Sequence, residues 1–164
     1  MNIKKIVNIP ASQLSEDELR FVDDMAGLLA PWGMAVMSGR VYGYLLLHQG
    51  PVSVNQIAAD LQVSKVAAWN AARSLEEFGH VRRYGEPGSK RALYGPTDNF
   101  DVPMVKQCVL LGALGALLRN SASTVAKGET ATRLRAMSQF YVSIQQAMEA
   151  SIRDLNAKKS LRKR

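Results

Sequence analysis

Apolar residues recur every three or four positions along most of the chain, and this spacing predicts amphipathic helices rather than strands. A first helix is predicted to begin at Ser15, where Glu18 completes a capping box, and to end before Pro31. A second helix is expected over residues 39–48, with Ser38 as its N-cap. The positions of this second helix that should face inward are Val41, Tyr42, Leu45 and Leu46.

Two further helices are predicted between Ser53 and Gly79, joined by a tight turn at residues 62–63. Ser53, with Gln56 at the capping-box position, and Ser64 are the expected N-caps, and Gly79 is the expected left-handed C-cap. Two helices joined by so short a turn form a helix-turn-helix, whose second helix meets base edges in proteins that bind DNA. The outward positions of that second helix are Lys65, Val66, Ala67, Trp69, Asn70 and Arg73.

The segment VRRYGEPGSKRALY, which begins at residue 81, predicts a β-hairpin, because Gly, Pro and Ser stand between two short runs of strand-forming residues. A hairpin directly after a recognition helix is a wing. Lys90 and Arg91 fall at its tip, where basic side chains are suited to neutralise phosphate. Arg82 and Arg83 are neighbours on a strand and point to opposite faces, so one could reach a phosphate and the other an acidic side chain.

Two long helices are predicted after the wing, over residues 102–120 and 129–157. The first has a wide apolar surface and is expected to be buried on most sides. Gly112 and Gly115 within it indicate close approach of another helix, because glycine otherwise costs a helix about 1 kcal/mol. The second carries a heptad-like stripe that should pair with another chain. This stripe consists of Leu134, Met137, Tyr141, Ile144, Met148, Ile152 and Leu155.

The charge of the chain is unevenly distributed. Its net charge is +7, and residues 101–164 carry 11 Lys and Arg against 4 Asp and Glu. This asymmetry favours a polyanionic partner, although a basic chain kept soluble by its charge has the same composition. The longest apolar run, residues 108–118, is shorter than the roughly 20 residues that span a bilayer, so we expect a cytoplasmic protein without a membrane partner.

Residue types that support catalysis or metal binding are scarce. The chain has 1 Cys, expected to be buried at position 108, and 2 His, so we expect no enzyme activity, no metal site and no cofactor. Trp69 could contact DNA, pack against the wing or line a ligand pocket. An aromatic cage of the kind that binds a quaternary ammonium group could be formed near the DNA-reading unit, although such residues are more often core. Its candidate residues are Trp32, Met34, Tyr42 and Tyr44.

The run from Ser38 to Tyr94 resembles the MarR-type winged-helix transcriptional regulators, and most closely their GbsR-like branch. The resemblance lies in SGRVYGYLLL, VSVNQIAADLQVSKVAAWNAARSLEEFGHVRR and the wing GEPGSKRALY. It implies a bacterial homodimer, usually a repressor, that binds a pseudo-palindromic operator and in some members responds to small ligands such as choline. At Trp69 this chain departs from the small polar residue usual in the family. The positions that match DNA-facing residues are Ser64, Lys65, Ala67, Trp69, Asn70 and Arg73, with Lys90 and Arg91 at the wing tip.

Taken together, these features predict a mainly helical chain with a small β-hairpin wing, organised as a winged helix-turn-helix with N- and C-terminal dimerisation helices. The expected parts are an N-terminal helix and connector (1–37), the winged helix-turn-helix (38–97), a helical dimerisation region (98–157) and a basic tail (158–164). The expected function is regulation of transcription by a homodimer bound to double-stranded DNA, with Arg82 as a further contact. The alternative is a winged-helix scaffold module that does not read DNA.

Overall fold

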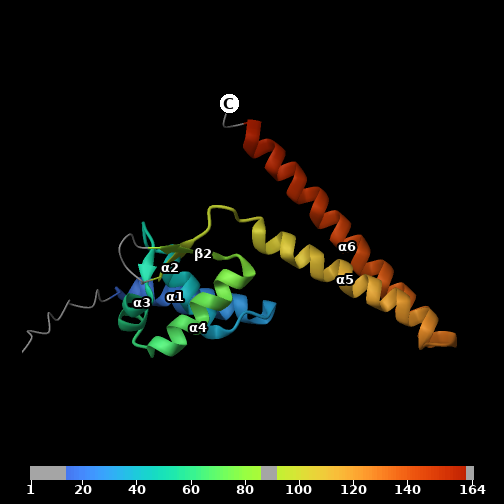
Figure 1. Ribbon diagram of the computed structural model, residues 1–164, viewed down its shortest axis with the longest axis horizontal. Helices are drawn as coiled ribbons and strands as arrows, with labels where there is room; N and C mark the ends of the chain where they lie inside the picture. Colours follow the sequence, from blue (N-terminus) through green and yellow to red (C-terminus); the bar gives the residue numbers. More distant parts are fainter. Residues whose placement is uncertain (1–13, 86–91, 162–164) are drawn as a thin grey trace, which may run out of the picture. The chain divides into compact units, whose positions relative to one another are not determined.

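The computed structural model describes residues 14–85 and 92–161. The chain divides into two compact units, one reaching to Asp98 and the other beginning at Asn99. The predicted fold class, mainly helical with a small sheet, is confirmed (Figure 1). The elements along the described chain are α1 (Glu16–Leu29), η1 (Ala30–Trp32), α2 (Val36–Leu46), β1 (Val52–Ser53), α3 (Val54–Asp60), α4 (Lys65–Phe78), β2 (Val81–Gly85), β3 (Ala92–Pro96), α5 (Val102–Thr124) and α6 (Gly128–Leu161).

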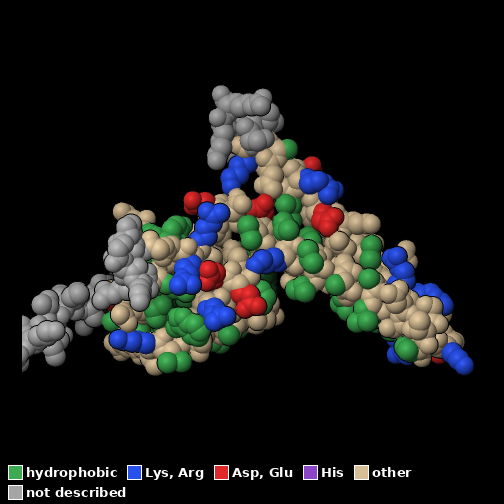
Figure 2. Space-filling model, viewed as in Figure 1, with side chains coloured by type: hydrophobic (Ala, Val, Ile, Leu, Met, Phe, Trp, Pro, Cys, Tyr) green, Lys and Arg blue, Asp and Glu red, His purple; other side chains and the backbone are tan. Residues whose placement is uncertain are grey.

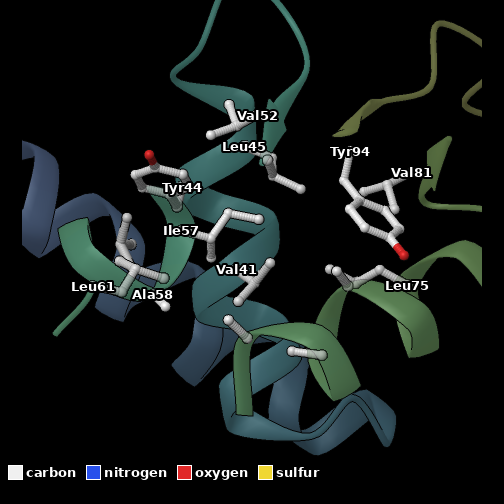
Figure 3. Packing of buried hydrophobic residues seen from close by; sticks show 14 residues of the cluster. Val41, Tyr44, Leu45, Val52, Ile57, Ala58, Leu61, Leu75, Val81 and Tyr94 are labelled. Atoms are coloured by element: carbon white, nitrogen blue, oxygen red, sulfur yellow. The ribbon is translucent and has the colours of Figure 1, made fainter. Parts of the chain in front are cut away.

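The first unit is held together by one apolar core to which α2, α3, α4 and the sheet all contribute. Its fully buried members include Val41 on α2, Ile57 on α3 and Leu75 on α4. Figure 3 shows Val41 beside Ile57, and Tyr94 and Val81 of the sheet approaching Leu75. The helix-turn-helix is therefore held against α2 and the sheet by one shared apolar core.

Helix α1 begins as predicted, because the backbone N–H of Ser15 donates to Glu18 Oε2 over 2.8 Å and the N–H of Glu18 donates to Ser15 Oγ over 3.3 Å. The bond from the Ser15 backbone N–H to the carboxylate, followed by the effect of the Ser15 hydroxyl, lowers the pKa of Glu18 below its ordinary value. The helix packs closely on α2 because Gly39 lacks a Cβ. A Cβ on Gly39 would lie only 2.7 Å from the Cα of Ala26. Arg40 then bonds to Asp23 of α1, with 2.8 Å between Nε and Oδ1.

The predicted start of α2 is wrong. The helix begins at Val36 rather than at residue 39, and its N-cap, Ala35, has no side-chain hydrogen bond. Ser38 lies inside the helix and is buried, because packing against α1 overrides its preference for a cap position. The inward face also differs from the prediction, since Leu46 is exposed and Tyr44 takes the buried position instead.

Helices α3 and α4 begin at the predicted caps. Ser53 Oγ accepts from the N–H of Gln56, and Ser64 Oγ accepts from the N–H of Ala67. The side chain of Gln56 does not complete a capping box, however, because it donates to the Asp60 carboxylate over 2.9 Å instead. Between the helices, Gln62 adopts a left-handed φ of 54°, which makes the tight turn that the sequence predicted.

Tyr44 and Asp60 form a buried polar pair that the hydrophobic pattern did not reveal. The Tyr44 hydroxyl donates to Asp60 Oδ2 over 2.6 Å, and both residues are buried. Burial and the Asp60 charge raise the pKa of Tyr44, so the hydroxyl stays a donor. This hydrogen bond joins α2 to the end of α3 and so helps to hold the helix-turn-helix in place.

Replacing Tyr44 with Phe is expected to lower the free energy of unfolding by about 1–3 kcal/mol, because a hydrogen bond to a buried carboxylate is lost. Urea unfolding followed by tryptophan fluorescence measures this, since Trp32 and Trp69 both lie in the first unit. Tyr42→Phe is the matched control. No hydrogen bond of the half-buried Tyr42 hydroxyl is found within the described residues, so we expect a change below about 0.5 kcal/mol. Equal losses in the two variants would contradict this role of Tyr44.

The sheet contains a third strand that the sequence did not predict. The strand order is β1-β3-β2, and both pairings are antiparallel. Val52 of β1 pairs with Tyr94 of β3, and Arg83 of β2 pairs with Tyr94 from the other side. A strand of two residues is too short to show an alternating pattern. It forms because the segment before α3 lies against the returning strand of the wing.

Helices α5 and α6 run side by side in opposite directions and form the second unit (Figure 1). The predicted close approach at two glycines is confirmed. A Cβ on Gly115 would lie 2.7 Å from Val142 Cγ2, and one on Gly112 would lie 2.8 Å from Gln145 Oε1. The Ser138 hydroxyl donates to the carbonyl of Gly115 over 2.6 Å, a contact possible only where the two helices nearly touch.

Three predictions about this unit are wrong. Helix α5 continues to Thr124 rather than ending at residue 120, so the connection to the next helix is shorter than predicted. Helix α6 continues to Leu161 into the predicted tail of residues 158–164, of which 162–164 lie outside the described residues. Lys158 and Lys159 stand in its last turn, where positive charge interacts favourably with the helix dipole.

The third wrong prediction is that α5 is buried on most sides. Within one chain only one face of α5 is covered, and most of its large apolar side chains are exposed. Among the described residues α5 is also the one helix long and apolar enough to cross a membrane by length and composition, a test that the core helix of a soluble protein passes as well. The expectation that the chain has no membrane-spanning segment considered only the uninterrupted apolar run of residues 108–118 and not the whole length of α5. The exposed apolar residues of α5 are Met104, Val105, Val109, Leu110, Leu114 and Leu117.

Candidate nucleic-acid interface

Helix α4 has one face in the core and one face in solvent. Ala68, Ala71, Ala72 and Leu75 are buried, which turns the opposite side of the helix outward. The predicted DNA-facing residues Lys65, Trp69, Asn70 and Arg73 are all exposed, as is Val66, and Ala67 is partly covered. The structure therefore brings the outward residues of α4 together on a single accessible surface, which we call the α4 face.

The N-terminus of α4 is electropositive. Ser64 caps it by accepting the Ala67 N–H over 3.1 Å, and the first turn contains no acidic residue. Lys65 is exposed in that turn and adds a full positive charge to the positive end of the helix dipole. Backbone N–H groups and a lysine at a helix N-terminus form a suitable contact for a phosphate group.

Trp69 and Arg73 interact with each other on the α4 face. The Arg73 guanidinium lies 5.3 Å from the centre of the Trp69 ring, within the range of a cation–π interaction. Trp69 remains 44% exposed, so its ring is neither a core residue nor covered by the described part of the wing. Trp69 was expected to contact DNA, to pack against the wing or to line a ligand pocket. The exposed ring favours the contact with DNA, and its interaction with Arg73 orients the guanidinium on the same face.

The wing contributes cations from β2. Arg82 and Arg83 are both exposed, and the register places Arg83 opposite Tyr94 and Arg82 opposite Gly95. Successive residues of a strand point to opposite faces of a sheet. The two arginines are successive residues of β2, so they lie on opposite faces, as expected. Burial raises the pKa of Tyr94, the negative charge of Glu76 adds to this effect, and the positive charges of Arg83 and Arg73 oppose it. Arg83, which the sequence named beside Arg82 without placing it among the DNA contacts, thus acts electrostatically on the same tyrosine as Arg73. Lys90 and Arg91, the predicted wing tip, lie outside the described residues.

The four candidates for an aromatic effector pocket lie in different environments. Trp32 is 80% exposed, whereas Tyr44 is fully buried and bonded to Asp60. Tyr42 is half-buried, and its ring centre lies 5.2 Å from that of His80. Met34 packs against the core. The burial of Tyr44 makes it a core residue, so the structure offers no support for a cage that includes it.

Side chains that bind metal ions are not gathered in the described part of the chain. No group of three or more His, Cys, Asp or Glu residues is placed to hold a metal ion there. Cys108 is buried as expected, and burial raises the pKa of its thiol, so the unreactive protonated form is favoured. The arrangement on α4 and β2 is suited to binding an extended polyanion.

No protein-family model and no curated protein matches the sequence. Among solved structures, the crystal structure of a transcriptional regulator superposes with a TM-score of 0.78 at 21% identity, covering 86% of this chain and 99% of that one. A weaker similarity is found to MepR, a transcription regulator of the Staphylococcus aureus multidrug efflux pump MepA, with a TM-score of 0.40 at 19% identity over 78% of this chain and 90% of that one. The first similarity spans both units, and it shows that the chain has the winged helix-turn-helix fold found in a transcriptional regulator.

Proposed function

We propose that this chain is a sequence-specific DNA-binding regulator of transcription that acts as a homodimer. The observation that carries the proposal is the α4 face, where Lys65, Trp69, Asn70 and Arg73 are exposed together on the second helix of a helix-turn-helix. In this motif the second helix enters the major groove. The similarity in fold to a transcriptional regulator supports the same function.

Each exposed polar residue of the α4 face has a distinct role in the proposed complex. Arg73 would bond to guanine and Asn70 to adenine, since arginine and asparagine match the hydrogen-bonding edges of these bases. Ser64, Lys65 and the backbone at the start of α4 would bind phosphate and so fix the position of the helix. Ala67 and Trp69 would make apolar contacts, and Arg82, Lys90 and Arg91 of the wing would add further phosphate contacts.

A second copy of the chain is proposed to cover the exposed apolar face of the second unit. Leu110, Leu114 and Leu117 follow one another at helical spacing on α5, and Phe140 and Ile144 are exposed on α6. Monomeric soluble proteins rarely expose so many large apolar side chains on neighbouring helices. A two-fold dimer formed through this face would present two α4 helices to half-sites about one turn of DNA apart, roughly 10 base pairs.

The finer features of the proposal come from the MarR-type, GbsR-like resemblance of residues 38–94. They are repression by blocking an operator, relief by a small effector, and a cytoplasmic location. An effector would weaken DNA binding only by binding one arrangement of the dimer better than another. The rival proposal is a winged-helix scaffold, which would use the same fold without neutralising phosphate.

Selection of bound fragments from a random duplex pool tests the proposal, because it reports binding, specificity and half-site symmetry together. On the selected duplex, Arg73→Ala is expected to raise Kd about 5- to 150-fold, the loss of one bidentate base contact. Its effect on a scrambled duplex should be much smaller. Fluorescence anisotropy at fixed salt concentration measures both values.

Arg20→Ala is the matched control, because it removes one exposed arginine from α1 of the same unit. Its effect should be less than about twofold, since a distant exposed charge is screened by salt. The unaltered chain should also lose affinity steeply with salt, by a log–log slope of about −0.9 for each phosphate neutralised. Binding that is absent in dilute buffer, or that is insensitive to salt, would favour the scaffold.

A further inference from the structure

The second unit contains an open groove at the side of α5 and α6, with a volume of about 490 Å³. Arg119 of α5 and Arg135 of α6 both line it. The remaining lining is mostly polar and comes from successive turns of α6, with Gln139, Ser143 and Gln146 on its wall. This groove lies within one unit and has no part in the proposed contact with DNA bases.

The two arginines of the groove have no acidic partner in the part of the chain that the structure describes. Neither makes an ion pair within residues 14–85 and 92–161. The sequence explains why, since α5 contains no Asp or Glu and α6 has none between Glu129 and Glu149. Figure 2 shows Lys and Arg side chains gathered over the end of the helix pair where α5 meets α6. Two guanidinium groups that line one groove without a counter-charge repel each other, and a shared anion would remove that repulsion.

We propose that this groove binds a small anion, namely a molecule that bears a carboxylate or a phosphate group. Each guanidinium presents a planar fork of N–H donors that fits either anion in a bidentate manner. The Gln139 and Gln146 amides and the Ser143 hydroxyl are exposed and can bond to the polar remainder of the ligand. Val142 is the one apolar side chain of the lining, so the ligand is small and polar rather than hydrophobic.

The groove remains accessible in the proposed dimer. Arg135 and Ile144 are nine residues apart, which at about 100° per residue places them on opposite sides of α6. Phe140 is exposed on the same side as Ile144. A second copy that covers the apolar side of α6 therefore leaves the arginine side open. This inference goes beyond the proposed function and does not depend on DNA binding.

Isothermal titration calorimetry on the full chain tests the proposal, with inorganic phosphate and succinate as the two probes. We expect saturable binding of at least one probe with a Kd of about 1 mM or lower. The better probe identifies the anion class, and succinamide, which has the shape of succinate without its charge, should not bind.

In the double variant Arg119→Gln/Arg135→Gln, Kd is expected to rise at least tenfold, because both charged contacts are lost. Arg133→Gln is the matched control, since Arg133 is exposed on the same turn of α6 but does not line the groove. Circular dichroism should show that the variants are folded. No saturable binding of either probe, binding of succinamide, or equal weakening by Arg133→Gln would overturn the proposal. DNA affinity is measured separately, so either proposal can fail alone.

Discussion

A chain that carries Leu110→Glu and Leu117→Glu is expected to be monomeric at concentrations where the unaltered chain is a dimer. These leucines are 57% and 62% exposed in the single chain, so the substitutions should leave its fold intact. In a dimer formed through α5, the same positions would bury four uncompensated charges. Sedimentation velocity measures the change in mass.

The same variant is expected to lose DNA affinity by about 100-fold or more on a duplex with two half-sites. A dimer binds its second half-site at a high effective concentration, and a monomer loses that advantage. On a duplex with one half-site, the variant and the unaltered chain should bind almost equally. This difference separates a defect in dimerisation from a defect in the α4 face.

Gln139→Glu/Gln146→Glu provides the control for added charge. It also places two acidic residues on the helix pair, but on the groove side of α6. We expect this variant to remain dimeric. The proposed dimer surface would be wrong if the unaltered chain sedimented as a monomer, or if the leucine variant stayed a dimer.

The second large effect is expected from Gly115→Val, which should lower the free energy of unfolding of the helix pair by about 3 kcal/mol. Even the first added carbon would lie 2.7 Å from Val142 Cγ2, and a β-branched side chain such as Val142 has little freedom to move. The valine would also separate Ser138 from the Gly115 carbonyl to which its hydroxyl donates. Thermal unfolding followed by circular dichroism measures the loss.

Gly112→Ala is the matched control on the same helix. Its new Cβ would meet only the end of the Gln145 side chain, which is long and can rotate away. Because alanine favours a helix over glycine by about 1 kcal/mol, this variant should be as stable as the unaltered chain or more stable. If both glycines tolerated substitution equally, the close approach of α5 and α6 would not require Gly115.

The elements that were predicted well are those defined by local chemistry. Ser15, Ser53 and Ser64 cap helices because their side chains accept from backbone N–H groups three residues ahead, and Gly79 ends α4 in a left-handed conformation. The outward face of α4 followed from the same local reasoning, since the period of a helix determines which side chains oppose its buried alanines.

The elements that were predicted poorly depend on contacts between distant segments. Ser38 would have been a good cap, but packing on α1 extends α2 beyond it. Strand β1 exists only because residues far along the chain pair with it. Tyr44 and Asp60, which are 16 residues apart, join two helices, and Arg119 and Arg135 line one groove from the two arms of a helical hairpin.

The sequence by itself determined the helical pattern, the helix-turn-helix and its outward basic residues, because these depend on caps, turns and periodicity within a few residues. Only the tertiary structure decided which apolar surfaces one chain can cover and which polar groups face each other. A hydrophobic pattern reports that a residue should be buried, but not whether its own chain or another copy buries it. For that reason the wide apolar face of α5, predicted to be covered, is exposed in the single chain.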